Sequence, residues 1–351
     1  MKDLNVTFYS TGGTQEFLES LGCKVIPVED VTSYPSILGG RVKTLHPKIF
    51  GGILARRELA SDIAQMQEYG IPEIDLVIVD LYPFEQTVAS GASEQDIIEK
   101  IDIGGISLIR AAAKNHKDVV IVASQKQYAL LDSVLESGKG ITTIEQRKEF
   151  AREAFNTSSH YDSAIFNYFN NGIDNSEKIS LTNGSVLRYG ENPHQKAIFY
   201  SFSNTKTNST LANSQVLQGK ELSYNNMLDA DAAWKAASDA YHAVAHIPNK
   251  TAVSVVKHLN PCGLAVSDSS IKALELAWAG DPISAFGGIL CFTSQVDADV
   301  ATWLSDKFIE IIIAPSYTDA AKELFAKKKN LRVLVTPIKP EITGEKLYRS
   351  I

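Results

Sequence analysis

Basic and hydroxyl-bearing side chains gather in one short loop in the first part of the chain. Residues 40–47 read GRVKTLHP and hold Arg41, Lys43, Thr44 and His46 within six positions, with glycine pairs on both sides. Cationic groups of different geometry beside glycines suit a phosphate or another polyoxygenated ligand. The plain alternative is a solvated basic loop. The variety of the cations favours a binding site for an anion.

A second loop of similar character lies at residues 10–14, which read STGGT. It follows a short β-rich run at residues 6–10 and precedes a helical pattern. Glycines let the backbone approach an anion, and a helix N-terminus offers free N–H groups. A tight turn with a helix cap explains the same pattern equally well. The loop therefore supports a phosphate site only together with its neighbours.

Groups that can move protons follow in two further segments. Tyr82 ends the run DLVIVDLY, nearly continuous in β-forming residues, where a ligand site of an α/β sheet is expected. Asp102 precedes two glycines and a helical pattern that puts Arg110 and Lys114 on one face. Asp102 alone is as consistent with a helix cap as with a catalytic acid. Together these groups could serve general acid–base chemistry beside a bound anion.

The second half of the chain carries a possible base of its own. Residues 257–263 read KHLNPCG and follow a β-rich run, so Lys257 and His258 lie at a strand end. A lone strand-end histidine is more often structural, but a neighbouring lysine disfavours the imidazolium form and leaves a neutral base. Asn225 and Asn226 stand just before an expected helix start. Further polar or glycine-containing segments lie at residues 187–195, 219–234 and 281–289.

The elements that must position these motifs alternate between β-rich and helical patterns. Residues 75–82 and 118–124 are apolar runs typical of strands buried on both faces, with helical segments between them. This alternation predicts an α/β fold with a parallel sheet and ligand loops at the strand ends. Residues 142–169 form a long helical stretch without proline or glycine, and a second α/β region follows.

Bulk properties exclude several classes of protein. The 351 residues suit two domains, and the net charge of −7 argues against a general nucleic-acid or membrane binder. Three cysteines without C-x-x-C spacing indicate reduced thiols, so we expect a cytoplasmic protein. We predict no metal site, because neither the segment from His258 to Cys262 nor the pair His242 and His246 has the glutamate of a zinc motif.

The motifs of the first half resemble a known enzyme family. STGGT, YPSILGGRVKTLHPKIFGGILARR, DLVIVDLYPFEQTV and IDIGGISLIRAAAKNH are similar, in order and spacing, to the IMP cyclohydrolase domain of the bifunctional AICAR transformylase/IMP cyclohydrolase. The resemblance implies a methylglyoxal-synthase-like fold and cofactor-free closure of formyl-AICAR to IMP. By matching motif positions, the catalytic residues would be Lys43, Tyr82, Asp102 and Lys114, and the nucleotide contacts Ser10, Thr11, Gly12, Arg41 and Thr44.

The motifs of the second half resemble the front part of the AICAR transformylase domain of the same family. They are LRYGENPHQ, GKELSYNNMLDADAAW, KHLNPCG and DPISAFGGI. The resemblance implies a cytidine-deaminase-like α/β fold and formyl transfer from 10-formyltetrahydrofolate to the 5-amino group of AICAR. His258 would be the proton acceptor and Lys257 its tuning or oxyanion partner. The implied substrate contacts are Arg188, Tyr189, Asn226, Phe286, Gly287 and Glu310.

The resemblance also implies a domain order and an assembly. We expect a cyclohydrolase domain at residues 1–123, a helical connector at 124–178 and the N-terminal part of the transformylase domain at 179–351. Family members are homodimers, so we expect a homodimer here. Against the family pattern, a strand, a loop and a helix are missing before STGGT, and a second deaminase-like half is missing after residue 351. We therefore expect weak or absent activity from the chain by itself.

One alternative stays open. Methylglyoxal-synthase-like domains also serve as non-catalytic regulatory modules that bind phosphate or nucleotides. Such a sensor needs the anion loops but no set of proton-transfer groups. The joint presence of Lys43, Tyr82, Asp102 and Lys114 favours an enzyme.

Overall fold

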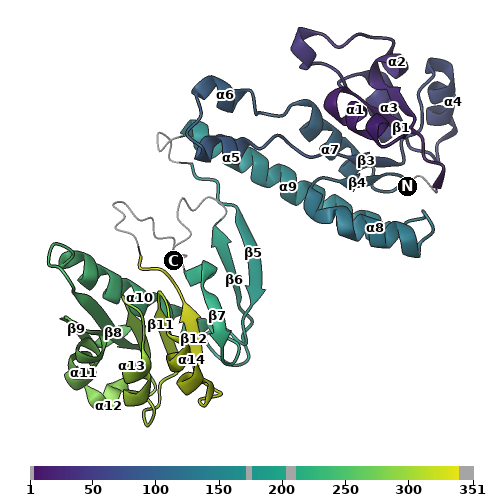
Figure 1. Cartoon of the computed structure of the whole chain (residues 1–351). Coiled ribbons are helices and arrows are strands. Elements are labelled where there is room, and N and C mark those ends of the chain that lie inside the picture. The colour runs from purple at the N-terminus through teal and green to yellow at the C-terminus, as the bar shows by residue number, and fades with distance from the viewer. Residues whose placement is uncertain (1–3, 171–175, 203–210, 340–351) are drawn as a thin grey trace. The chain divides into compact units, whose positions relative to one another are not determined.

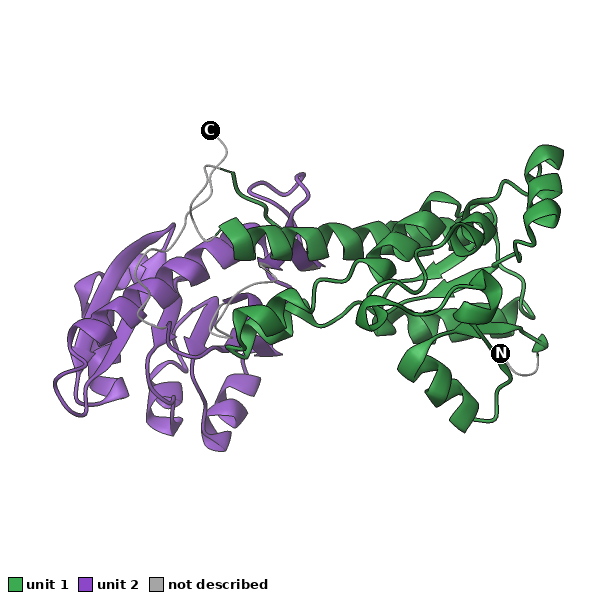
Figure 2. Ribbon diagram, turned by 90° about the horizontal axis from the view of Figure 1, so that it is seen from above, with its two compact units in different colours: residues 1–180 green, residues 181–351 purple. Residues whose placement is uncertain are grey.

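The computed structural model describes residues 4–170, 176–202 and 211–339, and it divides into two compact units. Unit 1 runs to Ser180 and unit 2 begins at Leu181 (Figures 1 and 2). Both are mixed α/β structures with parallel strands, as the sequence predicts. The long helical stretch at residues 142–169 belongs to unit 1.

Unit 1 contains two pairs of short parallel strands surrounded by helices. The predicted strand at residues 75–82 is shorter in the structure, because only three of its residues pair with the neighbouring strand. The strands are β1 (Phe8–Ser10), β2 (Val25–Pro27), β3 (Leu76–Ile78) and β4 (Val120–Val122), with β1 paired to β2 and β3 to β4. The α-helices are α1 (Gly12–Ser20), α2 (Val28–Thr32), α3 (Pro47–Leu54), α4 (Ala60–Tyr69), α5 (Phe84–Ala89), α6 (Glu94–Ile98), α7 (Gly104–Lys114), α8 (Tyr128–Ser137) and α9 (Ile144–Asn170), and 3-10 turns lie at Leu38–Gly40 and Gln125–Gln127.

The core of unit 1 forms where α7 and α9 pack together and against β4 (Figure 1). Ala112 of α7 and Ala154 of α9 are completely buried, and these small side chains let the two helices approach closely. Ile109 and Phe150 fill the remaining space between the helices and the strand. Because α7 is packed along its length, the residues at its two ends have fixed positions.

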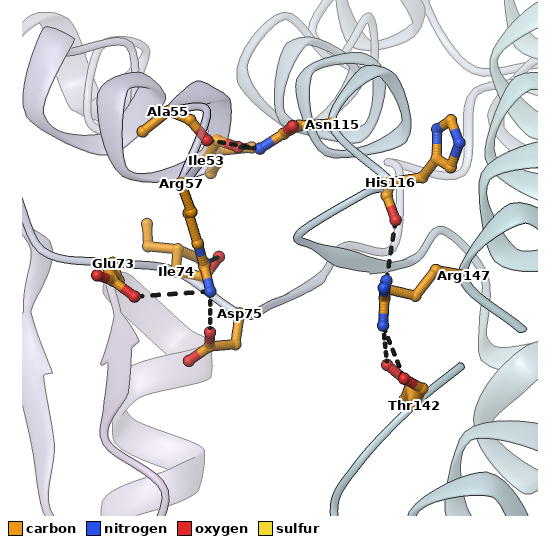
Figure 3. Close-up of polar contacts among 10 residues, drawn as sticks. All are labelled: Ile53, Ala55, Arg57, Glu73, Ile74, Asp75, Asn115, His116, Thr142 and Arg147. Carbon is orange, nitrogen blue, oxygen red and sulfur yellow. Dashed lines mark hydrogen bonds and ion pairs between the residues drawn. The ribbon is translucent and has the colours of Figure 1, made fainter. Parts of the chain in front are cut away.

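Polar contacts fix the C-terminal end of α7 as well (Figure 3). The side-chain amide of Asn115 donates to the carbonyl oxygens of Ile53, at 2.8 Å, and Ala55, at 3.0 Å. These carbonyls lie at the C-terminal end of α3, where no helical partner remains for them. On the α9 side, Arg147 donates from Nε to the His116 carbonyl at 3.0 Å. The C-terminal end of α3 and the first turn of α9 are thereby tied to the end of α7.

Figure 3 also shows contacts of Arg57 that fix the position of the chain just before β3. Arg57 lies 2.7 Å from the Asp75 carboxylate and donates to the carbonyl oxygen of Ile74 at 2.9 Å (Figure 3). Asp75 directly precedes β3, so this contact fixes where the strand begins.

Unit 2 is built on a six-stranded mixed sheet with the order β7-β12-β11-β10-β8-β9. The parallel strands β10, β11 and β12 form its centre, with β8 antiparallel to β10 and β7 antiparallel to β12. The strands of unit 2 are β5 (Leu181–Val186), β6 (Ile198–Phe202), β7 (Gln215–Gln218), β8 (Thr251–Lys257), β9 (Asn260–Ser267), β10 (Ile289–Phe292), β11 (Ile311–Ala314) and β12 (Arg332–Val335), with β5 and β6 forming a separate hairpin. The helices are α10 (Tyr224–Ala243), α11 (Ser270–Gly280), α12 (Pro282–Ala285), α13 (Ala298–Trp303) and α14 (Asp319–Ala326), with a 3-10 turn at Leu211–Asn213.

Helices cover both faces of this sheet, which explains the continuous apolar runs of its strands. Alternate residues of β8, β10 and β11 point to opposite layers, one occupied by α10 and the other by α11, α13 and α14. Alanines at positions 230, 233 and 237 let α10 lie close to the sheet. The β-rich run that precedes KHLNPCG forms β8, which ends at Lys257 because His258 and Leu259 turn the chain back into β9.

Candidate functional site

In unit 1, Lys43 joins the two predicted anion loops. A Cβ atom at Gly12 would lie 3.2 Å from Lys43 Nζ, and one at Gly40 would lie 2.5 Å from Lys43 Cε. The lysine therefore crosses Gly40 and brings its ammonium group to the first residue of α1. Gly40 has φ +86°, which also favours glycine there. Ser10 and Thr11 immediately precede this point, at the end of β1.

The same loop reaches the first turn of α7 through Thr44. A Cβ atom at Gly104 would lie 3.2 Å from Thr44 Oγ1. Asp102 lies at this turn, and its Oδ1 accepts a hydrogen bond from the Gly105 amide at 2.6 Å. The capping role that the sequence left open for Asp102 is thus present in the structure. Within the described residues its Oδ2 accepts no hydrogen bond.

Tyr161 of α9 fixes the backbone of Asp102 through its hydroxyl group. The sequence patterns did not identify this residue. The Asp102 amide donates to the Tyr161 hydroxyl at 2.9 Å, and that hydroxyl donates to the Lys100 carbonyl at 2.6 Å. Burial raises the pKa of Tyr161, so the hydroxyl keeps its proton for this bond. A tyrosine in a long helix gives no sequence signal for such a contact.

The remaining predicted residues of unit 1 are less closely grouped. Tyr82 is 55% exposed, and Lys100 Nζ lies 5.7 Å from its ring centroid. Arg41 forms an ion pair with Glu99, and the Thr11 hydroxyl donates to Glu29 at 3.0 Å. Both predicted ligand contacts therefore already have protein partners.

Lys114 lies at the opposite end of α7 from Asp102. The ten steps from Gly104 to Lys114, at 1.5 Å each, give a rise of about 15 Å along the helix axis. As the i, i+4 spacing predicts, Arg110 and Lys114 share one face and line the same surface hollow of about 370 Å³. Phe50 and Phe155 line it too, with the Arg110 guanidinium 5.7 Å from the Phe155 ring centroid. Asp102 and Lys114 are too far apart in one chain to contact the same atom.

In unit 2, strand directions gather the predicted residues at one edge of the sheet. Since β8 is antiparallel to β10, its C-terminal end lies beside the N-terminal ends of β10, β11 and β12. Lys257 ends β8 there, and its Nζ donates to the Phe286 carbonyl at 2.7 Å. Gly287 follows with φ +75°, and the Phe286 ring lies 5.2 Å from that of Phe308. His258 lies exposed in the turn that follows Lys257.

Five polar side chains form a second group at this edge, here called the Glu310 cluster: Arg188, Tyr189, Asn226, Glu310 and Arg332. Asn226 donates to Glu310 Oε2 at 2.9 Å, and Arg332 Nη1 lies 3.5 Å from the same oxygen. Arg188 donates to the Tyr189 hydroxyl at 2.8 Å and lies over its ring. That hydrogen bond, and a second with Ser223, lower the pKa of Tyr189. The cluster unites four predicted substrate contacts.

Arg332 is the member of this cluster that sequence reasoning missed. Its side chain is only 6% exposed, and it donates to the carbonyl oxygens of Lys220 and Glu221. Burial lowers the pKa of its guanidinium, and Glu310 opposes that shift. An arginine that opens the apolar run RVLV was the available signal, because a charge at the start of a buried strand requires partners.

The prediction that Asn225 and Asn226 precede a helix start is wrong. Both lie in the first turn of α10, which begins at Tyr224. Ser223 Oγ accepts from the Asn226 amide and Asn226 Oδ1 accepts from the Ser223 amide, so the pair forms a capping box. The usual signature has glutamate or glutamine at the third helical position, and asparagine there hides the cap.

Across the part of the chain that the structure describes, no three His, Cys, Asp or Glu side chains group together as metal ligands would. Among the described residues, no helix has the length and apolar character needed to cross a bilayer.

Comparisons with known proteins match both parts of the chain. The profile of the AICARFT/IMPCHase bienzyme matches residues 112–351, and that of the MGS-like domain matches residues 1–107. The predicted order of the two kinds of domain is thereby confirmed. A solved structure described as that of ForH shares 38% identity over 48% of this chain and 87% of its own, with a TM-score of 0.41 that is too low to establish a shared fold.

Curated relatives match nearly the whole chain. The bifunctional purine biosynthesis protein PurH of Bacteroides thetaiotaomicron is 55% identical over 94% of this chain, and PurH of Neisseria gonorrhoeae is 45% identical over 96%. The chain spans 62% and 65% of the lengths of these two relatives. The bienzyme profile alone covers more than half of the sequence. The chain belongs to the AICARFT/IMPCHase bienzyme family.

Proposed function

We propose that this chain takes part in the last two steps of IMP synthesis, with cyclisation in unit 1 and formyl transfer in unit 2. The observation that carries the proposal is the family membership over residues 112–351 together with an MGS-like domain before it. The name of its curated relatives, bifunctional purine biosynthesis protein, agrees with two reactions. A purely regulatory nucleotide-binding module is not favoured by these comparisons.

For cyclisation, the proposed substrate is formyl-AICAR. Its carboxamide nitrogen attacks the formyl carbon, a new C–N bond closes the ring, and the formyl oxygen leaves as water. Lys43 and the N–H groups at the starts of α1 and α7 lie close enough together to stabilise negative charge on one ligand. Asp102 Oδ2 is the oxygen available to hold the amide, and Tyr82 could supply a proton to the departing oxygen.

Lys114 takes a separate place in this proposal. Because about 15 Å separates it from the first turn of α7, it would act on another part of the ligand or from another chain. Arg110 beside it would strengthen any contact with an anionic group. A homodimer, as in the family, is part of the proposal.

For formyl transfer, the proposed substrates are AICAR and 10-formyltetrahydrofolate. The 5-amino nitrogen attacks the formyl carbon and loses a proton, the bond from that carbon to the folate nitrogen breaks, and this nitrogen gains a proton as tetrahydrofolate leaves. His258 would take the proton from the attacking amine, and Lys257 would stabilise charge on the formyl oxygen. The Glu310 cluster, with Phe286 and Gly287, would bind the nucleotide. This chemistry requires no metal.

We also propose a cytoplasmic location, because the cysteines are free thiols.

The cyclisation half of the proposal has a direct test. The chain is incubated with formyl-AICAR, and IMP formation is followed by absorbance beside a Lys43→Ala variant. We expect slow IMP formation by the unchanged chain, in line with the weak activity expected from its sequence, and a further fall of at least about a hundredfold in the variant, because the ammonium that joins both anion loops is gone. Binding of IMP without any turnover by the unchanged chain would contradict catalysis and support a nucleotide-binding module.

A further inference from the structure

The connection between β8 and β9 has a backbone conformation that its residues disfavour. Lys257 pairs with Asn260, which leaves His258 and Leu259 as a two-residue turn. Their φ angles are +53° and +66°. Two positive φ angles in a two-residue hairpin correspond to a type I′ turn, for which asparagine and glycine are preferred. Histidine and leucine persist in such a conformation only where the surrounding structure holds it.

Asp229 supplies that hold through the backbone of the turn. Its Oδ1 accepts a hydrogen bond from the Leu259 amide at 2.7 Å, and its Oδ2 accepts from the His258 amide at 3.4 Å. The Asn260 side chain donates to the His258 carbonyl at 2.8 Å. Hydrogen bonds to a carboxylate are stronger than those between neutral groups. One side chain of α10 thus holds both N–H groups of the turn.

The helix that carries Asp229 is itself rigidly supported. Asn226 lies three residues earlier on the same face of α10, in the capping box with Ser223 and in contact with Glu310. Further along, the Ser254 hydroxyl of β8 donates to the Ala233 carbonyl of α10 at 2.7 Å. The same helix face therefore orients the Glu310 cluster and the His258 turn.

We infer that Asp229 is a positioning residue for formyl transfer. By accepting hydrogen bonds from both amides of the turn, it presents the His258 imidazole to the substrate amine. The inference rests on the proposed function. The Asp229 carboxylate bonds backbone amides and not the imidazole ring. Within the described part of the chain, no hydrogen bond reaches that ring, so the backbone sets its direction. Asp229 therefore acts through geometry and not by sharing a proton with His258.

Three variants of the full chain separate positioning from charge. Asp229→Ala should lower kcat for formyl transfer between about tenfold and a hundredfold, because displacement of a reacting group by about 1 Å has effects of that size. The KM for AICAR should change less than about twofold, since the Glu310 cluster is intact. Asp229→Asn keeps an oxygen acceptor for the Leu259 amide, so it should retain most of kcat and an unchanged pH profile. Asp231→Ala is the matched control, because it removes an equal charge from the same helix, where Asp231 pairs with Lys235.

Rescue and amide exchange complete the test. Adding Leu259→Gly to Asp229→Ala should recover much of kcat, because glycine adopts the left-handed conformation without support. The Leu259 amide should exchange with solvent at least tenfold faster in Asp229→Ala than in the unchanged chain. Equal loss of kcat in Asp229→Asn with a shifted pH profile, or unchanged exchange, would overturn the inference. An unchanged chain that transfers no formyl group would refute the proposed function, while the exchange rates would still decide whether Asp229 holds the turn.

Discussion

Replacing Arg332 with methionine should destabilise unit 2 by an amount that the structure lets us estimate. Methionine keeps the apolar stem but removes the guanidinium, whose Nε and Nη2 donate to the Lys220 and Glu221 carbonyls at 3.1–3.3 Å. A hydrogen bond from a charged donor contributes about 1.5–3 kcal/mol. In the variant two carbonyl groups lose such a donor, which lowers the stability. The variant no longer buries a charged group, and this offsets part of the loss. The Glu310 carboxylate is 41% exposed, so its ion pair adds less than about 1 kcal/mol.

The expected net loss is about 2–4 kcal/mol in the free energy of unfolding. Urea denaturation followed by circular dichroism measures it by linear extrapolation. Lys322→Met is the control, because Lys322 is 49% exposed and its partner Asp319 is almost fully exposed. The control should lose less than about 1 kcal/mol. An Arg332→Met loss no larger than that of the control would refute the assignment of Arg332 as a buried anchor.

Three further predictions concern unit 1. Gly40→Ala should slow cyclisation at least about tenfold, because the added Cβ would lie 2.5 Å from Lys43 Cε. Gly39→Ala is the control, since Gly39 also has a positive φ but a Cβ there would contact no other atom; equal rates in the two variants would exclude displacement of Lys43 as the cause. Asn115→Leu should lower the free energy of unfolding by about 1–3 kcal/mol, since the buried Ile53 carbonyl and the half-buried Ala55 carbonyl lose their donor. Thermal denaturation beside the exposed-site variant Asn156→Ala checks this, and equal losses would contradict it. The hydrogen bond to Glu85 raises the pKa of His160, against the opposing effects of burial and Lys126. The stability that this contact adds to the folded chain should therefore be complete below the unfolded pKa of about 6.5 and lost as pH rises through the higher folded pKa. His160→Gln should remove this part of the pH dependence of unfolding, and an unchanged pH profile in the variant would contradict the prediction.

Short-range patterns in the sequence predicted the order of elements and the motifs at their ends. Apolar runs such as TAVSVVK are long enough to identify buried strands, and glycines beside cations indicated the loop that brings Lys43 close to the start of α1. The exact ends of strands were less accessible. The turn at His258 was hidden because histidine and leucine are not the residues that a type I′ turn prefers.

The supporting residues could not be predicted, because they act across long distances in the sequence. Tyr161 contacts Asp102 from 59 positions away, and Arg332 reaches Glu221 across 111. Asp229 meets the Leu259 amide across 30 positions. Each is an ordinary polar residue of a helix or strand when only its neighbours in the sequence are considered. Only the packing of α9, α10 and β12 brings them to the candidate sites.

In the proposed function, each unit carries the residues of a separate reaction. The most direct measurement follows both reactions in Lys43→Ala and His258→Ala, as IMP formed from formyl-AICAR and as tetrahydrofolate released from 10-formyltetrahydrofolate with AICAR. We predict that Lys43→Ala loses cyclisation and keeps formyl transfer, and that His258→Ala does the reverse. Loss of both reactions in either folded variant would contradict the account.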